Sequence, residues 1–365
     1  CIRDRGKSEP VQAWKIGAIS GRRRSDAADA PLFGREAELS MLEPYFDGSR
    51  SVGLIDISGG AGIGKSRLIR ELRTTHSRHV WRFGDCDPYE ASTPYYVFRR
   101  LLREVAGIVR GISPAEAADR LAAVVGERAP HLVPWIPLLA TAMDVPAAET
   151  VETARLGAEF RQARLHQTAA EFVDAMVDEP CVLVVEDAQW IDEESRALMD
   201  YLAKAAANRP WLIIAVHRPS TDVPARVGQV ALELESLAEQ GARALVEHAL
   251  ADTALLEHQL RDIVDRADGN PLFLLELVAA TRSGEAMPDS VESLVQARID
   301  RLDRVKRQLL RYSSVAGMSF DPELLADALG DDIPEIRDLD AWDGLDEFLV
   351  RRSSGELRFR QSLFH

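Results

Sequence analysis

The residues Gly59-Gly60-Ala61-Gly62-Ile63-Gly64-Lys65-Ser66 decide the fold of this chain, because they match the pattern G-x-x-x-x-G-K-[ST] of a phosphate-binding loop. The run 52–58 before the loop is mostly apolar and has the length of a strand, and the run 67–73 after it carries apolar residues on one helical stripe. Glycines allow successive backbone N–H groups to turn inward around a phosphate, and the start of a helix adds partial positive charge. The stretch therefore predicts a nucleoside triphosphate site rather than a plain glycine-rich turn.

Side chains at the end of this loop have distinct expected roles. Lys65 can reach the β- and γ-phosphates, and the hydroxyl of Ser66 can be a ligand of Mg²⁺. Arg67 is the next residue of the same expected site. The chain contains no N-K-x-D motif that would recognise guanine. The expected ligands are therefore ATP and Mg²⁺ rather than GTP.

A second motif, Cys181-Val182-Leu183-Val184-Val185-Glu186-Asp187, has the Walker B form of an apolar strand that ends in carboxylates. A P-loop enzyme needs one carboxylate for Mg²⁺ and one to orient or deprotonate the attacking water. We expect Glu186 to hold Mg²⁺ and Asp187 to act on the water, although position alone leaves both as candidate metal ligands. The alternative is a strand that merely runs out into a polar loop, and the presence of a P-loop argues against it.

Further strands complete the expected sheet. Apolar runs at 80–84, 211–217 and 230–234 have strand length, and Arg218 follows the second of them directly. Strands that alternate with helices predict a parallel, three-layer sheet with the nucleotide at the C-terminal strand ends. The predicted fold class is an α/β P-loop NTPase with an extra strand between the Walker A and Walker B strands. In that position Arg218 would lie beside the γ-phosphate as a sensor residue.

The pattern of helices and loops divides the chain into three predicted units. Residues 31–234 are expected to form the P-loop ATPase domain, 235–285 a helical lid domain, and 286–365 a truncated winged-helix-like domain of three helices and a hairpin. The last unit has sixteen Asp and Glu against eleven Lys and Arg, a balance that is poor for contacts to DNA phosphates. We therefore expect a regulatory unit and no direct DNA binding by this part of the protein.

Bulk composition excludes several classes of function. The 365 residues have a formal charge of −15, with 46% hydrophobic and 28% charged residues, which argues for globular domains and against a general nucleic-acid-binding surface. No apolar run reaches the roughly 18 residues of a membrane span. Three cysteines without metal or disulfide spacing fit the cytoplasm. The chain starts without Met and stops after a strand-like run, so we expect a piece of a longer protein.

The order of these motifs resembles the STAND class of signal-transduction ATPases. The resemblance is to their AAA-like module, which occurs in LuxR-type transcription regulators and in cyclase-linked signalling proteins of bacteria. It covers about residues 31–365 and runs from Phe33-Gly34-Arg35-Glu36 through the P-loop, the Walker B strand and Arg218 to Gly269-Asn270-Pro271 and the last unit.

The resemblance adds roles to single residues. It implies that Gly34 and Arg35 lie near the nucleotide and that Pro271 touches adenine. It also implies that Arg218 senses the γ-phosphate and that Asp187 is catalytic. Family members often have Asp where Glu186 stands, so the metal-binding role of that position rests on its place in the motif.

The first residues resemble a different domain. Residues 1–17 are similar to the end of class III adenylate/guanylate cyclase domains through Gly6-Lys7-Ser8-Glu9-Pro10-Val11-Gln12-Ala13-Trp14, and 18–30 form an expected linker. Together the two resemblances imply an ATPase that works as a slow regulatory switch, converting ATP and water to ADP and phosphate. Its partner would be a cyclase or another effector domain of the same protein, with the cyclase active site outside this chain. A homo-oligomer is also possible under this interpretation.

Two other functions fit the same motifs. A LuxR-type transcription regulator would carry a DNA-binding domain beyond His365. A AAA-type remodelling motor would turn over continuously as a ring, with an arginine supplied by a neighbouring subunit.

Overall fold

The computed structural model describes residues 31–365 apart from 110, 207–208, 220–228, 251–255, 284–289, 330–335, 337–341, 343, 347, 352–354 and 360–365. The cyclase-like tail (1–17) and the linker (18–30) that the sequence predicts lie outside the described residues. Within the described ranges, every helix is too short or too polar to cross a membrane.

Strands and helices alternate in the first part of the chain, and helices dominate the second part. The elements are α1 (Glu36–Phe46), β1 (Leu54–Gly59), α2 (Lys65–Thr75), β2 (Val80–Asp85), η2 (Pro88–Glu90), α3 (Tyr96–Val105), α4 (Pro114–Arg128), η3 (Pro130–Trp135), α5 (Ile136–Met143), α6 (Val151–Arg155), α7 (Ala158–Met176), β3 (Cys181–Glu186), η4 (Ala188–Trp190), α8 (Glu193–Ala206), β4 (Trp211–His217), β5 (Gln229–Leu234), α9 (Glu239–Leu250), α10 (Glu257–Ala267), α11 (Pro271–Ser283), α12 (Val291–Arg301), α13 (Arg304–Val315), β6 (Ser319–Phe320), α14 (Pro322–Leu329), β7 (Leu349–Arg351) and β8 (Leu357–Phe359).

The main sheet has five parallel strands in the order β2-β3-β4-β1-β5. The strand β4 lies between β1, which leads into the P-loop, and β3, which carries the Walker B motif. The expected extra strand is thus confirmed. Because the strands are parallel, their C-terminal ends meet at one edge, where Ser58 pairs with His217 and Asp85 pairs with Glu186.

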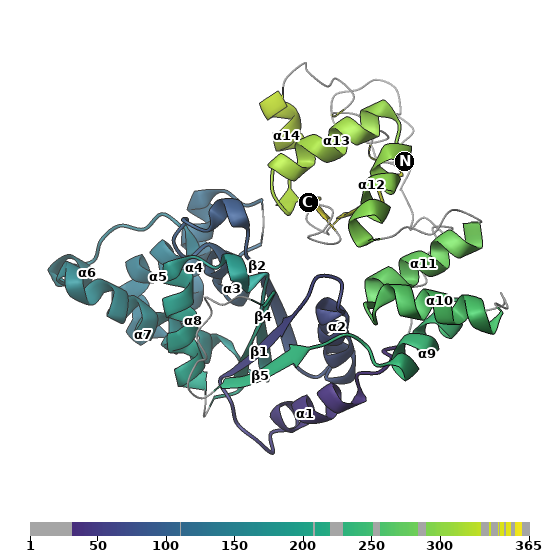
Figure 1. The fold of residues 1–365 in the computed structure, drawn as a ribbon. Helices are drawn as coiled ribbons and strands as arrows, with labels where there is room; N and C mark the ends of the chain where they lie inside the picture. The colour runs from purple at the N-terminus through teal and green to yellow at the C-terminus, as the bar shows by residue number, and fades with distance from the viewer. Residues whose placement is uncertain are drawn as a thin grey trace, which may run out of the picture.

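The central strands are apolar along their length because helices cover both faces of the sheet. In β3, Leu183 and Val185 pack into the core formed with α3, α4, α5, α7 and α8. Val182 and Val184 alternate with them and pack on the opposite face, against α1 and α2. Figure 1 shows the two groups of helices on the two sides of the sheet. This arrangement fixes the start of α2, and with it the P-loop, at the edge where the strands end.

Two further units follow the sheet, each with its own core. The helical unit (α9, α10 and α11) packs around Leu245, Ile263 and Leu274. The C-terminal unit contains α12, α13 and α14 with a small sheet in the order β6-β8-β7, in which β7 and β8 form the hairpin that the sequence predicts. In Figure 1 the helical unit lies to the right of the sheet and the C-terminal unit lies above it.

Candidate nucleotide-binding site

The P-loop connects the end of β1 to the start of α2. Gly62 has φ +75° and Gly64 has φ +102°, a left-handed backbone that favours glycine. A Cβ atom on Gly62 would also come within 2.8 Å of the Cβ atom of Leu272 in α11. Glycine at this position is therefore required both by the shape of the loop and by the close approach of the helical unit.

Lys65 lies folded over its own loop. Its Nζ atom donates hydrogen bonds to the carbonyl oxygens of Gly59, at 2.7 Å, and Gly60, at 2.9 Å. Burial lowers the pKa of Lys65 to about 8, and Asp187 partly opposes this effect while Arg218 adds to it. The ammonium group is thus held against the loop by two carbonyl oxygens, and Asp187 and Arg218 lie close enough to affect its charge.

Asp187 and Arg218 are linked through a third side chain. The side chain of Gln189 donates from Nε2 to Asp187 Oδ1 at 3.3 Å and accepts at Oε1 from the backbone N–H of Arg218 at 3.1 Å. Burial raises the pKa of Asp187. Gln189 therefore ties the Walker B strand to the end of β4. No role was predicted for Gln189 from the sequence, although its position two residues after the Walker B motif could have indicated one.

Arg35 forms a hydrogen bond with the backbone of the P-loop. One of its terminal nitrogens donates to the carbonyl oxygens of Ile63, at 3.2 Å, and Glu235, at 2.6 Å, and the other pairs with Glu38. Only 5% of the residue is exposed. Its neighbour Gly34, with φ +63°, lets this segment approach the helical unit closely. The geometry gives Arg35 a positioning role beside the site, and its predicted contact with nucleotide stays a prediction.

The segment before α11 holds the helical unit against the P-loop. Asn270 donates from Nδ2 to the carbonyl oxygen of Ala61 at 3.0 Å, and its Oδ1 accepts from the backbone N–H of Leu272 at 3.0 Å. A Cβ atom on Gly269, which has φ +68°, would come within 2.3 Å of the carbonyl oxygen of Leu237. The Gly-Asn-Pro turn thus connects three parts of the chain, with Pro271 facing the loop.

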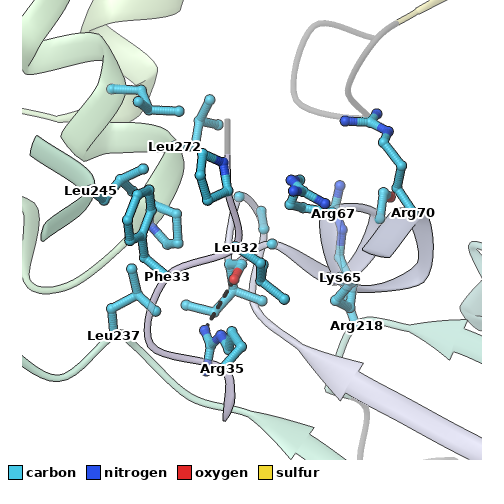
Figure 2. Close-up of a pocket in the computed structure, with 18 of the residues that line it drawn as sticks. Leu32, Phe33, Arg35, Lys65, Arg67, Arg70, Arg218, Leu237, Leu245 and Leu272 are labelled. Atoms are coloured by element: carbon cyan, nitrogen blue, oxygen red, sulfur yellow. Dashed lines mark hydrogen bonds between the residues drawn. The ribbon is translucent and has the colours of Figure 1, made fainter. Parts of the chain in front are cut away.

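A cavity of about 340 Å³ opens where these parts meet. Its lining is Pro31, Leu32, Phe33, Arg35, Ala61, Gly62, Ile63, Gly64, Lys65, Ser66, Arg67, Arg70, Asp187, Arg218, Leu237, Leu245, Pro271, Leu272, Leu275, Met318 and Arg358. Figure 2 shows its two ends: Phe33, Leu237, Leu245 and Leu272 gather on one side, and Lys65, Arg67, Arg70 and Arg218 gather on the other. One end is apolar and the other strongly cationic.

The structure brings most of the predicted residues together. Lys65, Ser66, Arg67, Asp187, Arg218, Arg35 and Pro271 all line the cavity with Ala61 to Gly64 of the P-loop. Four of the predicted residues do not line the cavity: Gly34, Gly59, Gly60 and Glu186. Each of them lies within two positions of a lining residue in the sequence. Glu186 instead pairs with Arg358 of the C-terminal unit, at 3.1 Å between Oε2 and a terminal nitrogen.

Several lining residues had no predicted role. They include Leu237 and Leu245 of the helical unit and its entry, Arg70 on α2, and Met318 and Arg358 of the C-terminal unit. Arg70 lies on the same helix as Lys65, five residues further on, and this position could have indicated a role. The others become neighbours of the P-loop only through the packing of separate units.

The parallel sheet and its P-loop define this protein as a P-loop NTPase. Residues 31–214, half of the chain, match the family of the AAA ATPase domain, and the chain belongs to that family. An uncharacterized protein of Rhizobium meliloti is 27% identical over 361 residues, which covers 90% of this chain and 34% of that protein. The chain thus spans about a third of the length of this relative.

One solved structure shares the fold at low sequence identity. A signal transduction ATPase with numerous domains (STAND) from Pyrococcus horikoshii, which carries a tetratricopeptide repeat sensor, superposes with a TM-score of 0.54 at 13% identity. That similarity covers 92% of this chain and 42% of the Pyrococcus chain. The Holliday junction branch migration motor RuvB of Thermotoga maritima gives a TM-score of 0.37 at 14% identity, over 90% of this chain and 93% of RuvB.

Proposed function

We propose that this chain is an ATP-operated switch module of a multidomain bacterial signalling protein, which binds ATP with Mg²⁺ and hydrolyses ATP slowly. The observation that carries the proposal is the composition of the cavity, to which the ATPase domain, the helical unit and the C-terminal unit all contribute. A ligand that touches all three units can bias how they pack, which is the physical basis of a switch. Membership of the AAA family and the resemblance to STAND proteins support the same function.

The two ends of the cavity suit the two ends of ATP. The cationic end offers Lys65, Arg67 and Arg218 to the phosphates, together with the backbone N–H groups of the P-loop. The apolar end offers Phe33 and Leu245 to the adenine base. In the proposed complex Ser66 and Glu186 would hold Mg²⁺, which neutralises phosphate charge when it is bound.

The remaining polar residues suit hydrolysis. The carboxylate of Asp187 would orient the attacking water and accept its proton. Arg218, whose backbone N–H donates to the same Gln189 side chain that contacts Asp187, would stabilise the charge that develops on the γ-phosphate. The products are ADP and phosphate.

The proposed switch is tested by measuring bound nucleotide and turnover together. The purified 365-residue chain is denatured and its nucleotide is quantified by ion-exchange chromatography, while a parallel sample is assayed for steady-state ATPase activity. ADP near one molecule per chain, with turnover well below about 1 s⁻¹, is expected for a slow switch. An empty site with fast turnover would favour the remodelling motor.

Lys65 provides the first mutational test of the site. The change Lys65→Ala removes one charge-assisted contact to the phosphates, which is worth about 1.5–3 kcal/mol and corresponds to roughly 10- to 150-fold weaker ATP binding. Isothermal titration calorimetry measures the affinity. The control is Arg73→Ala, which removes a cation from the exposed side of the same helix, outside the cavity, and should leave the affinity unchanged. Equal ATP affinity in Lys65→Ala and wild type would refute the site.

The proposed output is control of a cyclase or another effector domain within the same longer protein. The support is the resemblance of residues 1–17 to the end of a class III cyclase. The test is cyclic nucleotide formation by the full-length protein, with and without Lys65→Ala. Sequence-specific DNA binding by the full-length protein, without cyclase activity, would instead support the LuxR-type regulator.

A further inference from the structure

Arg358 joins the C-terminal unit to the nucleotide site. It lies in β8 between Leu357 and Phe359, whose side chains are buried in the core of the C-terminal unit. Because side chains alternate along a strand, Arg358 points the other way, out of that core. Its guanidinium pairs with Asp85, with Glu186 at 3.1 Å and with Asp187 at 4.0 Å, and only 14% of its side chain is exposed.

The three carboxylates of this Arg358 cluster come from the ends of neighbouring strands. Asp85 is the last residue of β2, Glu186 is the last residue of β3, and the two are paired in register. Three carboxylates that converge on one place repel each other unless a cation lies between them. In this structure Arg100 of α3 pairs with Asp85 at 2.9 Å, and the guanidinium of Arg358, from a separate unit, is the cation that contacts all three carboxylates. Burial lowers the pKa of Arg358 to about 10, so the group keeps its charge at neutral pH.

A second contact docks the same unit without using the Walker B carboxylates. The backbone N–H of Met318 donates to Asp87 Oδ2 at 3.0 Å, and this bond is buried. Among the described residues, Arg358 and Met318 thus both hold the C-terminal unit over the ends of β2 and β3. Of these two contacts, only that of Arg358 uses Glu186, a predicted ligand of Mg²⁺.

We propose that Arg358 and Mg²⁺ compete for Glu186, so that loading the site with ATP and Mg²⁺ releases the C-terminal unit from the strand ends. This inference rests on the proposed ATP site and adds the means by which its occupancy is transmitted. Two cations that share one carboxylate in a buried site repel each other strongly. The cation on the separable unit is the one that leaves, and the same coupling makes the docked C-terminal unit weaken the binding of ATP with Mg²⁺.

The test is Arg358→Met, which keeps much of the apolar stem and removes the charge. Calorimetry should show ATP with Mg²⁺ bound at least about fivefold more tightly than by wild type, the lower end of ordinary coupling factors. The gain should disappear when EDTA removes Mg²⁺. Small-angle X-ray scattering should give the nucleotide-free variant a larger radius of gyration than nucleotide-free wild type, similar to wild type with ATP and Mg²⁺.

Two companion variants keep the test decisive. Arg351→Ala removes an exposed arginine from the same hairpin and should behave as wild type in both measurements. Asp85→Asn weakens the Arg358 cluster from the other side and should tighten binding in the same direction, even if Arg358→Met fails to fold.

Each contrary outcome has a distinct meaning. Weaker binding of ATP by Arg358→Met would overturn competition and make Arg358 a phosphate ligand. Unchanged affinity and radius in both Arg358→Met and Asp85→Asn would make the cluster a purely structural contact. These comparisons require that wild type binds ATP and that Lys65→Ala weakens this binding. If either requirement fails, the proposed function itself is wrong.

Discussion

At the scale of single residues, burial tunes Lys65 toward its role. An ordinary lysine is fully charged at about pH 8, whereas desolvation lowers the pKa of Lys65 to about 8. Phosphates placed beside its Nζ atom favour the charged form and raise the pKa again. In the proposed site, ATP binding should therefore be accompanied by proton uptake at Lys65 when the pH is near or above 8.

The direction of the pH dependence follows from this shift. Well below pH 8 Lys65 is already protonated, and its contribution to affinity is fully present. As the pH rises through 8, the free protein loses the proton that the complex retains, so the affinity for ATP should fall by up to about tenfold per pH unit. Calorimetry in buffers with different ionisation enthalpies measures both the affinity and the proton uptake.

The control for this prediction replaces Lys65 with arginine, whose charge does not titrate in this pH range. Arginine stays protonated over the whole range, so Lys65→Arg, where it binds ATP, should show no proton uptake between about pH 7.5 and about 9. An affinity of wild type that stays constant over this range would contradict the prediction. It would mean that Lys65 keeps its ordinary charge in the free protein.

At the scale of elements, Asn270 has two functions that can be separated. Its Oδ1 atom caps α11 by accepting the N–H groups of Leu272 and Phe273, and its Nδ2 atom holds the carbonyl oxygen of Ala61 in the P-loop. Asn270→Ala loses both functions. We expect a loss of stability of about 1 kcal/mol from the cap, together with weaker ATP binding.

The matched variant Asn270→Asp keeps the cap and loses the donor. Its carboxylate still accepts from the start of α11 but faces the oxygen of Ala61 without a hydrogen to share. Thermal unfolding should therefore be close to wild type, while calorimetry should show weakened ATP binding. Normal ATP binding by Asn270→Asp would show that the helical unit positions the loop through packing alone.

The elements that carry the site were predictable because each is encoded locally. The P-loop, the Walker B strand and the strand before Arg218 each combine an apolar run with polar residues at its end, and the sheet order follows from the P-loop fold. Arg358 was not predictable in this way. Its partner Asp85 is 273 residues away in sequence, and their contact depends on how two separately folded units dock. The same holds for Met318 and Asp87.

At the scale of the whole molecule, all three units contribute residues to one cavity, and a further ion pair joins Arg298 of the C-terminal unit to Glu276 of the helical unit. The helical unit reaches the cavity through Leu245, Pro271, Leu272 and Leu275, and the C-terminal unit reaches it through Met318 and Arg358. Because each unit has its own core, docking can change without unfolding any of them. This is the arrangement that the proposed switch requires, with polar contacts such as those of Arg358 and Asp87 between units that each have a core.

Asp87 tests whether docking can be weakened apart from the nucleotide site. One of its carboxylate oxygens accepts from the N–H of Tyr89 and the other from the N–H of Met318. Asp87→Ala leaves a buried N–H without its acceptor, which costs about 1–3 kcal/mol as long as the units stay docked. We expect calorimetric unfolding to separate into two transitions, with a larger radius of gyration before the first.

The control variant is Asp321→Ala, which loses only a local acceptor for Glu323 within the C-terminal unit and should leave the radius of gyration unchanged. A single transition and an unchanged radius in Asp87→Ala would show that Arg358 and apolar packing suffice to hold the units together.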